Sequence, residues 1–215
     1  MAKERLKSPR ARLFVALDLP EAIREGLASW QREELSDEAL RPSNPETLHM
    51  TLAFLDYQPE KDIERIAEAA TGFEAPAPLV RLLPDPVPVP RSRPRLYAID
   101  TESDETVALQ AEVERRLVDA GYYKPEKRKF WPHLTVARVR SERRPPEQRG
   151  KGGKRRRWGR PMRVHDPPGP LPDELLEPFH AVRVALYRSH LRPTGAEYAP
   201  VATVELPIAG SGKAS

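Results

Sequence analysis

Apolar and polar residues alternate most clearly over residues 47–55, which read Thr-Leu-His-Met-Thr-Leu-Ala-Phe-Leu. Alternation of this kind predicts a β-strand with one buried face. Because successive side chains of a strand point to opposite faces, His49 and Thr51 would project side by side, away from the apolar residues between them. The segment therefore places two polar groups on one face of a predicted strand.

The same pattern returns over residues 131–139, which read Trp-Pro-His-Leu-Thr-Val-Ala-Arg-Val. His133 and Thr135 repeat the earlier pair, and the chain has five histidines in all. A single histidine on an apolar strand is more often structural than catalytic. A second copy with the same threonine partner reverses that expectation, so we take both His-x-Thr pairs as candidate catalytic residues.

Periodicity and turn residues predict the remaining elements. Further strands are expected at residues 12–19, 76–90, 95–101, 179–188 and 197–206. Helices are expected at residues 22–35, 61–70, 105–120 and 171–177, an irregular connection at 41–45 and a turn at 193–195. The prolines of residues 76–90 predict an edge strand there, because proline cannot donate a hydrogen bond to a ladder. Asp104 is the expected N-cap of the helix that Gly121 ends.

The composition limits the class of protein. A chain of 215 residues fits one domain, or two small lobes that share a core. The absence of cysteine excludes disulfides, a thiolate metal site and a cysteine nucleophile. Residues 1–12 are basic without the apolar core of a signal peptide, and no run approaches the length of a membrane span. We therefore expect a cytoplasmic protein with no membrane partner.

Two imidazoles suit acid–base chemistry at phosphorus. With pKa values near 6.5, one ring can accept a proton from a nucleophile while the other donates a proton to the leaving oxygen. Each threonine hydroxyl, two residues further on, can donate a hydrogen bond to a non-bridging oxygen as charge concentrates there. This chemistry needs no metal and no cofactor, and the sequence offers no obvious set of metal ligands.

The two motifs and their flanks resemble the two-histidine phosphoesterases. The relevant segments are Arg-Leu-Phe-Val-Ala-Leu-Asp-Leu-Pro near the N-terminus, the two His-x-Thr runs, and Leu-Tyr-Arg-Ser near the C-terminus. The resemblance is closest to the bacterial and archaeal RNA 2′,3′-cyclic phosphodiesterases, also called 2′-5′ RNA ligases. It implies an α+β fold of two lobes, with largely antiparallel sheets and outer helices around a central cleft. One domain would span residues 12–206, between a basic tail at 1–11 and a C-terminal tail at 207–215.

The resemblance also implies the reaction and its partner. A terminal 2′,3′-cyclic phosphate of RNA would be opened to a 2′-phosphomonoester, without a metal, and the reaction would reverse as 2′-5′ RNA ligation. By position in the family, His49 would be the proton donor and His133 the proton acceptor, with Thr51 and Thr135 beside them. The assignment of acid and base stays open, because the reverse reaction exchanges the two roles. We expect the protein to be a monomer.

Two residues five positions after the histidines raise a question of strand geometry. The family's phosphate-contacting arginine falls on Arg138, yet in a straight strand Arg138 faces away from His133 and would need a bulge to reach the phosphate. Phe54 has the same parity after His49, and a core role is expected for it rather than base stacking. Trp131 is expected to pack in the core or between the lobes.

Charge is concentrated in one segment. Lysine and arginine number 36 against 32 acidic residues, for a net charge of +4, and residues 138–163 hold twelve basic residues against Glu142 and Glu147. We expect a mobile basic loop at residues 141–170. It is either an electrostatic guide for the RNA backbone or a solvated insertion, and both interpretations stay open.

Two alternative functions remain from the sequence. A phosphodiesterase acting on a small cyclic nucleotide would carry identical motifs. A non-catalytic RNA-binding module would not require both pairs, so the intact Thr51 and Thr135 argue against it.

Overall fold

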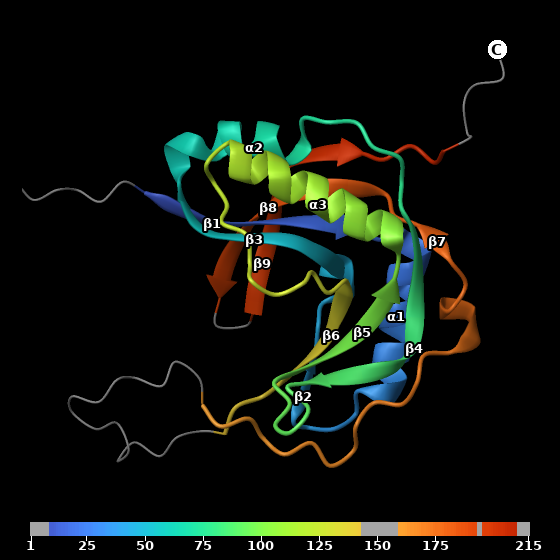
Figure 1. Ribbon diagram of the computed structural model, residues 1–215. Helices are drawn as coiled ribbons and strands as arrows, with labels where there is room; N and C mark the ends of the chain where they lie inside the picture. The colour runs from blue at the N-terminus through green and yellow to red at the C-terminus, as the bar shows by residue number, and fades with distance from the viewer. Residues whose placement is uncertain (1–8, 143–158, 193–194, 210–215) are drawn as a thin grey trace, which may run out of the picture.

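The computed structural model describes residues 9–142, 159–192 and 195–209 (Figure 1). The strands in these residues are β1 (Arg10–Asp18), β2 (Leu40–Pro42), β3 (His49–Pro59), β4 (Leu79–Val89), β5 (Leu96–Glu102), β6 (His133–Val139), β7 (Phe179–His180), β8 (Arg183–Arg192) and β9 (Gly195–Glu205). The α-helices are α1 (Glu21–Glu34), α2 (Ile63–Thr71) and α3 (Asp104–Asp119).

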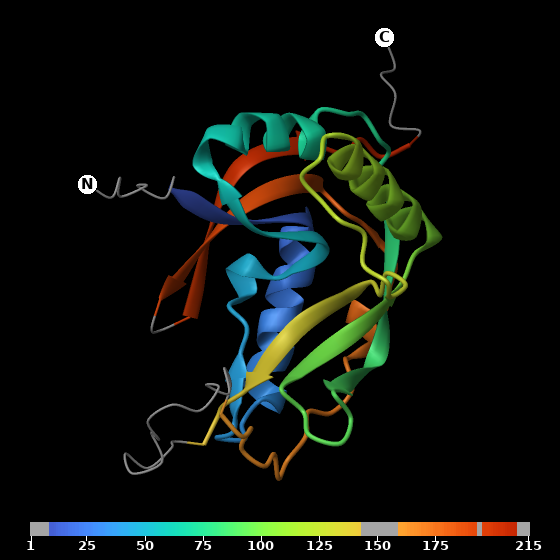
Figure 2. The same cartoon turned by 60° about the vertical axis from the view of Figure 1, so that its left-hand side comes forward.

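The strands form one curled antiparallel sheet. Its order is β7-β4-β5-β6-β3-β1-β8-β9, with β2 paired to β6 beside β3. Helices α2 and α3 lie together at the top of the molecule in Figures 1 and 2, and α1 lies below them. Helix α2 packs on β8 and β9, and α3 on β3 and β4. The predicted α+β class is confirmed.

The core lies between the sheet and the helices. Leu17 of β1, Leu27 of α1, Ile66 of α2 and Leu117 of α3 are all fully buried. Burial of an aliphatic side chain of this size contributes about 1.5–3 kcal/mol. These buried apolar residues therefore hold each helix against the sheet. None of the helices in the described part of the chain is long and apolar enough to cross a membrane.

Several element boundaries differ from the predicted ones. Ser103, not Asp104, is the N-cap of α3, because its side chain accepts the hydrogen bond from the Thr106 N–H. Gly121 ends that helix with φ +79°, a conformation that glycine adopts without steric cost. The helix expected at residues 171–177 is only a 3-10 turn, Asp173–Leu175.

The sheet edges differ as well. β4 is not a free edge over its whole length, because Leu79 and Val80 pair with β7. The strand expected at residues 179–188 is divided into β7 and β8, and the connection at 41–45 contains part of the short strand β2. Residues 143–158 of the basic loop and 193–194 of the predicted turn lie outside the described residues. The tail and domain boundaries stay predictions.

Candidate active site

Strands β3 and β6 meet at a single residue pair, Met50 opposite Leu134. Both side chains are fully buried on the core face. The same register places His49 beside Thr135 and Thr51 beside His133 on the other face. In a regular ladder the two histidines would then be diagonal neighbours, with Cβ atoms about 7–8 Å apart. Beyond this pair, β3 continues along β1 and β6 along β5, so the two motifs meet where the halves of the sheet join.

Each imidazole is oriented by the carbonyl two residues before it. Nδ1 of His49 lies 2.7 Å from the Thr47 oxygen, and Nδ1 of His133 lies 2.8 Å from the Trp131 oxygen. A carbonyl only accepts hydrogen bonds, so Nδ1 carries the hydrogen in both rings. Nε2 is therefore the nitrogen that gains and loses a proton in each histidine.

Aromatic rings hold the two imidazoles on their flanks. The Phe14 ring stacks on His49 with centroids 4.9 Å apart, and Tyr198 meets His49 edge-on at 5.5 Å. The Trp131 indole stacks on His133 at 3.9 Å and an angle of 15°. Trp131 is 37% exposed and packs against the imidazole, so the first of the two expected places, the core, is wrong.

An aspartate stands beside each histidine on the neighbouring strand. Asp18 of β1 lies opposite His49, and Asp100 of β5 lies opposite His133. Burial lowers the pKa of both histidines, which is the larger effect, while the nearby aspartate charge raises each pKa in part. The charges of Arg138 and His133 lower the pKa of His49 further. Both rings therefore favour the neutral form more than a free imidazole does.

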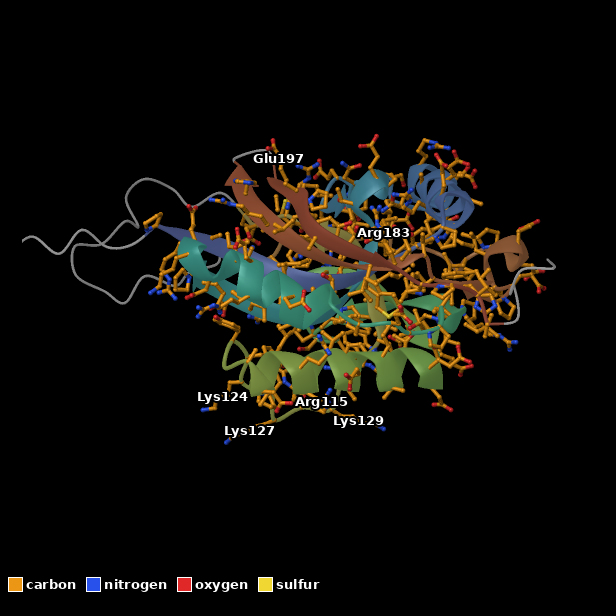
Figure 3. The ribbon with its side chains drawn as sticks, turned by 90° about the horizontal axis from the view of Figure 1, so that it is seen from above. Arg115, Lys124, Lys127, Lys129, Arg183 and Glu197 are labelled. Atoms are coloured by element: carbon orange, nitrogen blue, oxygen red, sulfur yellow. The ribbon has the colours of Figure 1, made fainter. Side chains whose placement is uncertain are left out.

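The two aspartates are themselves held. Asp100 Oδ1 accepts a hydrogen bond from the Trp131 indole N–H at 2.8 Å. Asp18 accepts hydrogen bonds from Arg183 Nε at 2.7 Å and from the Tyr187 hydroxyl at 2.8 Å. Burial and the neighbouring Asp18 raise the pKa of Tyr187 to about 12. Figure 3 shows Arg183 at the strands, whereas Arg115 of α3 and the three lysines that follow this helix, Lys124, Lys127 and Lys129, lie at the periphery.

A β-bulge follows the threonine in each motif. In β6, Thr135 pairs with Ala98 but Ala137 pairs with Tyr97, so Val136 is the extra residue. The extra residue reverses the alternation, and Arg138 emerges on the same face as His133 and Thr135. A straight strand would turn Arg138 away from His133. Because of the bulge, Arg138 lies on the same face as His133 and can reach a phosphate bound there.

Strand β3 contains the equivalent bulge. Thr51 pairs with Ala16 and Ala53 with Val15, which leaves Leu52 as the extra residue. Phe54 is thereby turned onto the face of His49 and Thr51, where its side chain is 54% exposed. The expected core role of Phe54 is wrong for this reason. The sequence did carry a signal, because two apolar residues in succession follow each threonine and interrupt the period of two.

A buried glutamine supports each bulge. Gln31 of α1 donates its side-chain N–H to the Val136 carbonyl at 2.7 Å, and Gln110 of α3 donates to the Leu52 carbonyl at 3.4 Å. The two side chains are 3% and 7% exposed. A bulge leaves backbone groups without ladder partners, and a buried carbonyl needs a donor. Sequence reasoning missed both glutamines and both aspartates, because they lie on other elements.

Other candidate sites are separate from this face. In the described residues, no group of three or more histidine, aspartate or glutamate side chains is placed to hold a metal ion. A cavity of about 580 Å³ lies beside the N-terminus of α3, and residues such as Arg81, Thr101 and Pro132 line it. None of the four motif residues belongs to its lining.

Comparison with known proteins gives the class. A protein from Thermus thermophilus has the same fold, with a TM-score of 0.70 at 24% identity over 92% of this chain and 99% of that one. The structure of LigT from E. coli in its apo form matches with a TM-score of 0.65 at 22% identity over 93% and 99% of the two chains. The fold is therefore that of the phosphoesterases whose structures match.

Sequence similarity narrows the class to a family. The model of the family described as LigT like Phosphoesterase matches residues 17–82. The RNA 2′,3′-cyclic phosphodiesterase of Archaeoglobus fulgidus is 32% identical over 135 residues, covering 60% of this chain and 73% of that protein. The protein of that name from Methanocaldococcus jannaschii is 26% identical over 188 residues, covering 87% and 96%. The chain belongs to the LigT-like phosphoesterase family.

Proposed function

We propose that this protein hydrolyses the 2′,3′-cyclic phosphate at the 3′ end of RNA to a 2′-phosphomonoester, with His49 and His133 as the acid–base pair. The observation that carries the proposal is the junction of β3 and β6, where the Met50–Leu134 pair brings both His-x-Thr motifs onto one face. The names of the relatives support the choice of substrate. A cyclic phosphate placed over this junction would contact both rings at once.

The proposed reaction moves two protons. His133 Nε2 accepts a proton from the attacking water, the new bond forms between water oxygen and phosphorus, and the bond from phosphorus to the 3′ oxygen breaks. His49 Nε2 donates a proton to that 3′ oxygen, which leaves as a hydroxyl. Position in the motif is the basis for this assignment. A 5′ hydroxyl that attacks in place of water would break the same bond to the 3′ oxygen and form a 2′-5′ linkage.

Charge develops on the non-bridging oxygens as the water attacks. The hydroxyls of Thr51 and Thr135 donate hydrogen bonds to these oxygens, and the Arg138 guanidinium neutralises their charge. No step requires a metal ion, because the two imidazoles supply both proton transfers. Activity in the presence of a chelator is therefore expected to equal activity without it, and loss of turnover on chelation would contradict this mechanism.

The decisive experiment uses an oligonucleotide that ends in a 2′,3′-cyclic phosphate and identifies the phosphomonoester formed. We expect the 2′-phosphate; a 3′-phosphate, or no reaction, would overturn the proposal. His49→Ala and His133→Ala should each lower the rate by about 10²–10⁴-fold. His190→Ala is the matched control, since the side chain of His190 is exposed and lies at the far end of β8.

A further inference from the structure

Arg41 and Arg138 stand directly opposite each other on β2 and β6. Residues opposite one another in an antiparallel pair point to the same face, and Arg138 lies on the face of the motif residues because of the bulge at Val136. Arg41 therefore shares that face. Both arginines are exposed, whereas Leu40 beside Arg41 is buried on the other face.

The pair is electrostatically unfavourable in the free protein. Like charges directly opposite each other in a sheet are destabilising. Among residues 9–142, 159–192 and 195–209, no carboxylate pairs with either guanidinium and no side-chain hydrogen bond involves them. Two arginines at facing positions without an acidic partner form a site for an anion, since the planar guanidinium binds phosphate oxygens in a bidentate manner.

The position of Arg41 and Arg138 relative to the His-x-Thr motifs indicates which anion they bind. Val136 is the extra residue of the bulge, so Thr135 and Arg138 are successive residues on the same face. Their separation along the strand is about 6.6 Å. That step is comparable to the spacing between successive phosphates of an extended nucleic-acid strand. The Arg138 charge lowers the pKa of His49, so the two side chains on this face are close enough to interact electrostatically. Strand β2, to which Arg41 belongs, lies in the lower part of Figure 1, away from α2 and α3 at the top.

We infer that Arg41, which stands opposite Arg138 at the reacting phosphate, binds the phosphodiester immediately 5′ of the nucleotide that carries the cyclic phosphate. This inference rests on the proposed function and adds a substrate class to it. The site then selects ends with a second phosphate, as in an oligonucleotide, over a nucleoside 2′,3′-cyclic phosphate that has none. Arg41 is a specificity-determining residue, because it touches the substrate away from the reacting atoms.

The test compares Arg41→Gln with the unaltered protein on two substrates. One is a dinucleotide ending in a 2′,3′-cyclic phosphate, and the other is the nucleoside 2′,3′-cyclic phosphate of the same terminal base. Loss of a charged hydrogen bond predicts a fall of about tenfold or more in kcat/KM for the dinucleotide. The fall for the mononucleotide should be less than about threefold. The slope of log kcat/KM against log salt for the dinucleotide should decrease by about 0.7, the value for one phosphate contact on a single strand.

Two further variants complete the design. Arg65→Gln changes the net charge equally on the exposed outer side of α2, and it should affect neither substrate. Arg41→Lys should restore part of the dinucleotide rate, because charge is retained without bidentate geometry. Removal of one of two facing like charges should leave the melting temperature of Arg41→Gln unchanged or raise it, which separates a lost contact from a lost fold.

The outcomes are distinguishable. A loss with Arg41→Gln that is equal on both substrates, or absent on both, would overturn the assignment of Arg41 while the proposed function stands. If the unaltered protein opens neither substrate, the proposed function fails and this inference fails with it. A loss confined to the dinucleotide supports both.

Discussion

Gln31 and Gln110 occupy equivalent places in the two halves of the sheet. Each lies on a helix, and each donates its side-chain amide to the carbonyl of the bulged residue that follows a catalytic-candidate threonine, at 2.7 Å for Val136 and 3.4 Å for Leu52. The internal repeat of this protein thus extends from the His-x-Thr motif to the bulge and its support. The bulge turns Arg138 in one half, and Phe54 in the other, onto the face of the histidines.

Replacement of Gln31 should reduce both stability and activity. Gln31→Met keeps the volume of the side chain but leaves the carbonyls of Val136 and Ser43 without this donor. The Val136 carbonyl keeps the Ser43 N–H as a donor at 2.9 Å, so the cost is that of lost hydrogen bonds, about 0.5–1.5 kcal/mol each. Each kcal/mol lowers the melting temperature by about 2–4 °C in a domain of this size. Thermal unfolding followed by circular dichroism measures the first effect.

The activity of Gln31→Met distinguishes a change in the orientation of Arg138 from a loss of folded protein. If the bulge reverts to a regular strand, Arg138 turns away, so kcat should fall at temperatures where the variant is fully folded. Gln110→Met is the matched variant, and its effect on stability should be smaller because its bond to Leu52 is longer. Full activity of folded Gln31→Met would show that the bulge does not depend on this glutamine.

These bulges also explain what the sequence does and does not reveal. The alternating pattern was enough to predict both motif strands and to place each histidine beside its threonine. Register between β3 and β6 depends on a single pair, Met50 and Leu134, that no local pattern specifies. Strand β2 was missed, and β7 was predicted as one strand with β8. These strands are three and two residues long and exist only through pairing with distant segments.

The residues that support the site from other elements could not be predicted from the sequence, because their positions also depend on long-range pairing and packing. Asp18 and Asp100 are adjacent to the histidines only across strands, at register positions set by the whole sheet. Gln31 and Gln110 are ordinary polar residues of amphipathic helices until the fold buries them. In contrast, Leu52-Ala53 and Val136-Ala137 are visible breaks in alternation, and the same break in both motifs indicates a shared geometry between the two halves of this chain.

Trp131 should matter for turnover and little for substrate binding. Its indole lies parallel to the His133 ring at 3.9 Å and is anchored to Asp100, so it fixes the orientation of that imidazole. Trp131→Ala frees the ring, and misplacement of a catalytic group by about 1 Å costs up to about 10²-fold. We expect kcat to fall with KM nearly unchanged in steady-state assays, and Trp131→Phe to retain most of the rate. A rise in KM alone would indicate that the indole contacts the substrate instead.

The pH dependence of kcat/KM should show a bell shape centred on the acid side of 6.5. The reactive form carries one proton on the histidine pair, so activity is lost when both rings are protonated or both are neutral. Burial lowers the pKa of His49 and of His133 below the ordinary value of 6.5, which moves both limbs to lower pH. A profile centred well above 6.5 would contradict this account of the free enzyme.

Asp100→Asn tests the same electrostatics in one half of the site. The Asp100 charge raises the pKa of His133, and the asparagine oxygen can still accept from the Trp131 indole. Removal of the charge should therefore shift one limb of the profile to lower pH while the ring stays in place. Asp119→Asn, on the exposed end of α3, is the control and should leave the profile unchanged.

Phe54 should contribute to substrate binding and not to stability. Its ring is 54% exposed on the histidine face, 6.2 Å from Phe14, and a base that stacks on an aromatic ring gains about 1–3 kcal/mol. Phe54→Ala should therefore lower kcat/KM for a nucleoside 2′,3′-cyclic phosphate by about 10–100-fold, mainly through KM, with a melting temperature close to that of the unaltered protein. Phe54→Tyr keeps a π-face and should retain activity. Phe54→Leu decides between stacking and simple apolar contact, because leucine covers similar area without a ring: activity equal to that of the tyrosine variant would rule out stacking as the reason this side chain stands exposed.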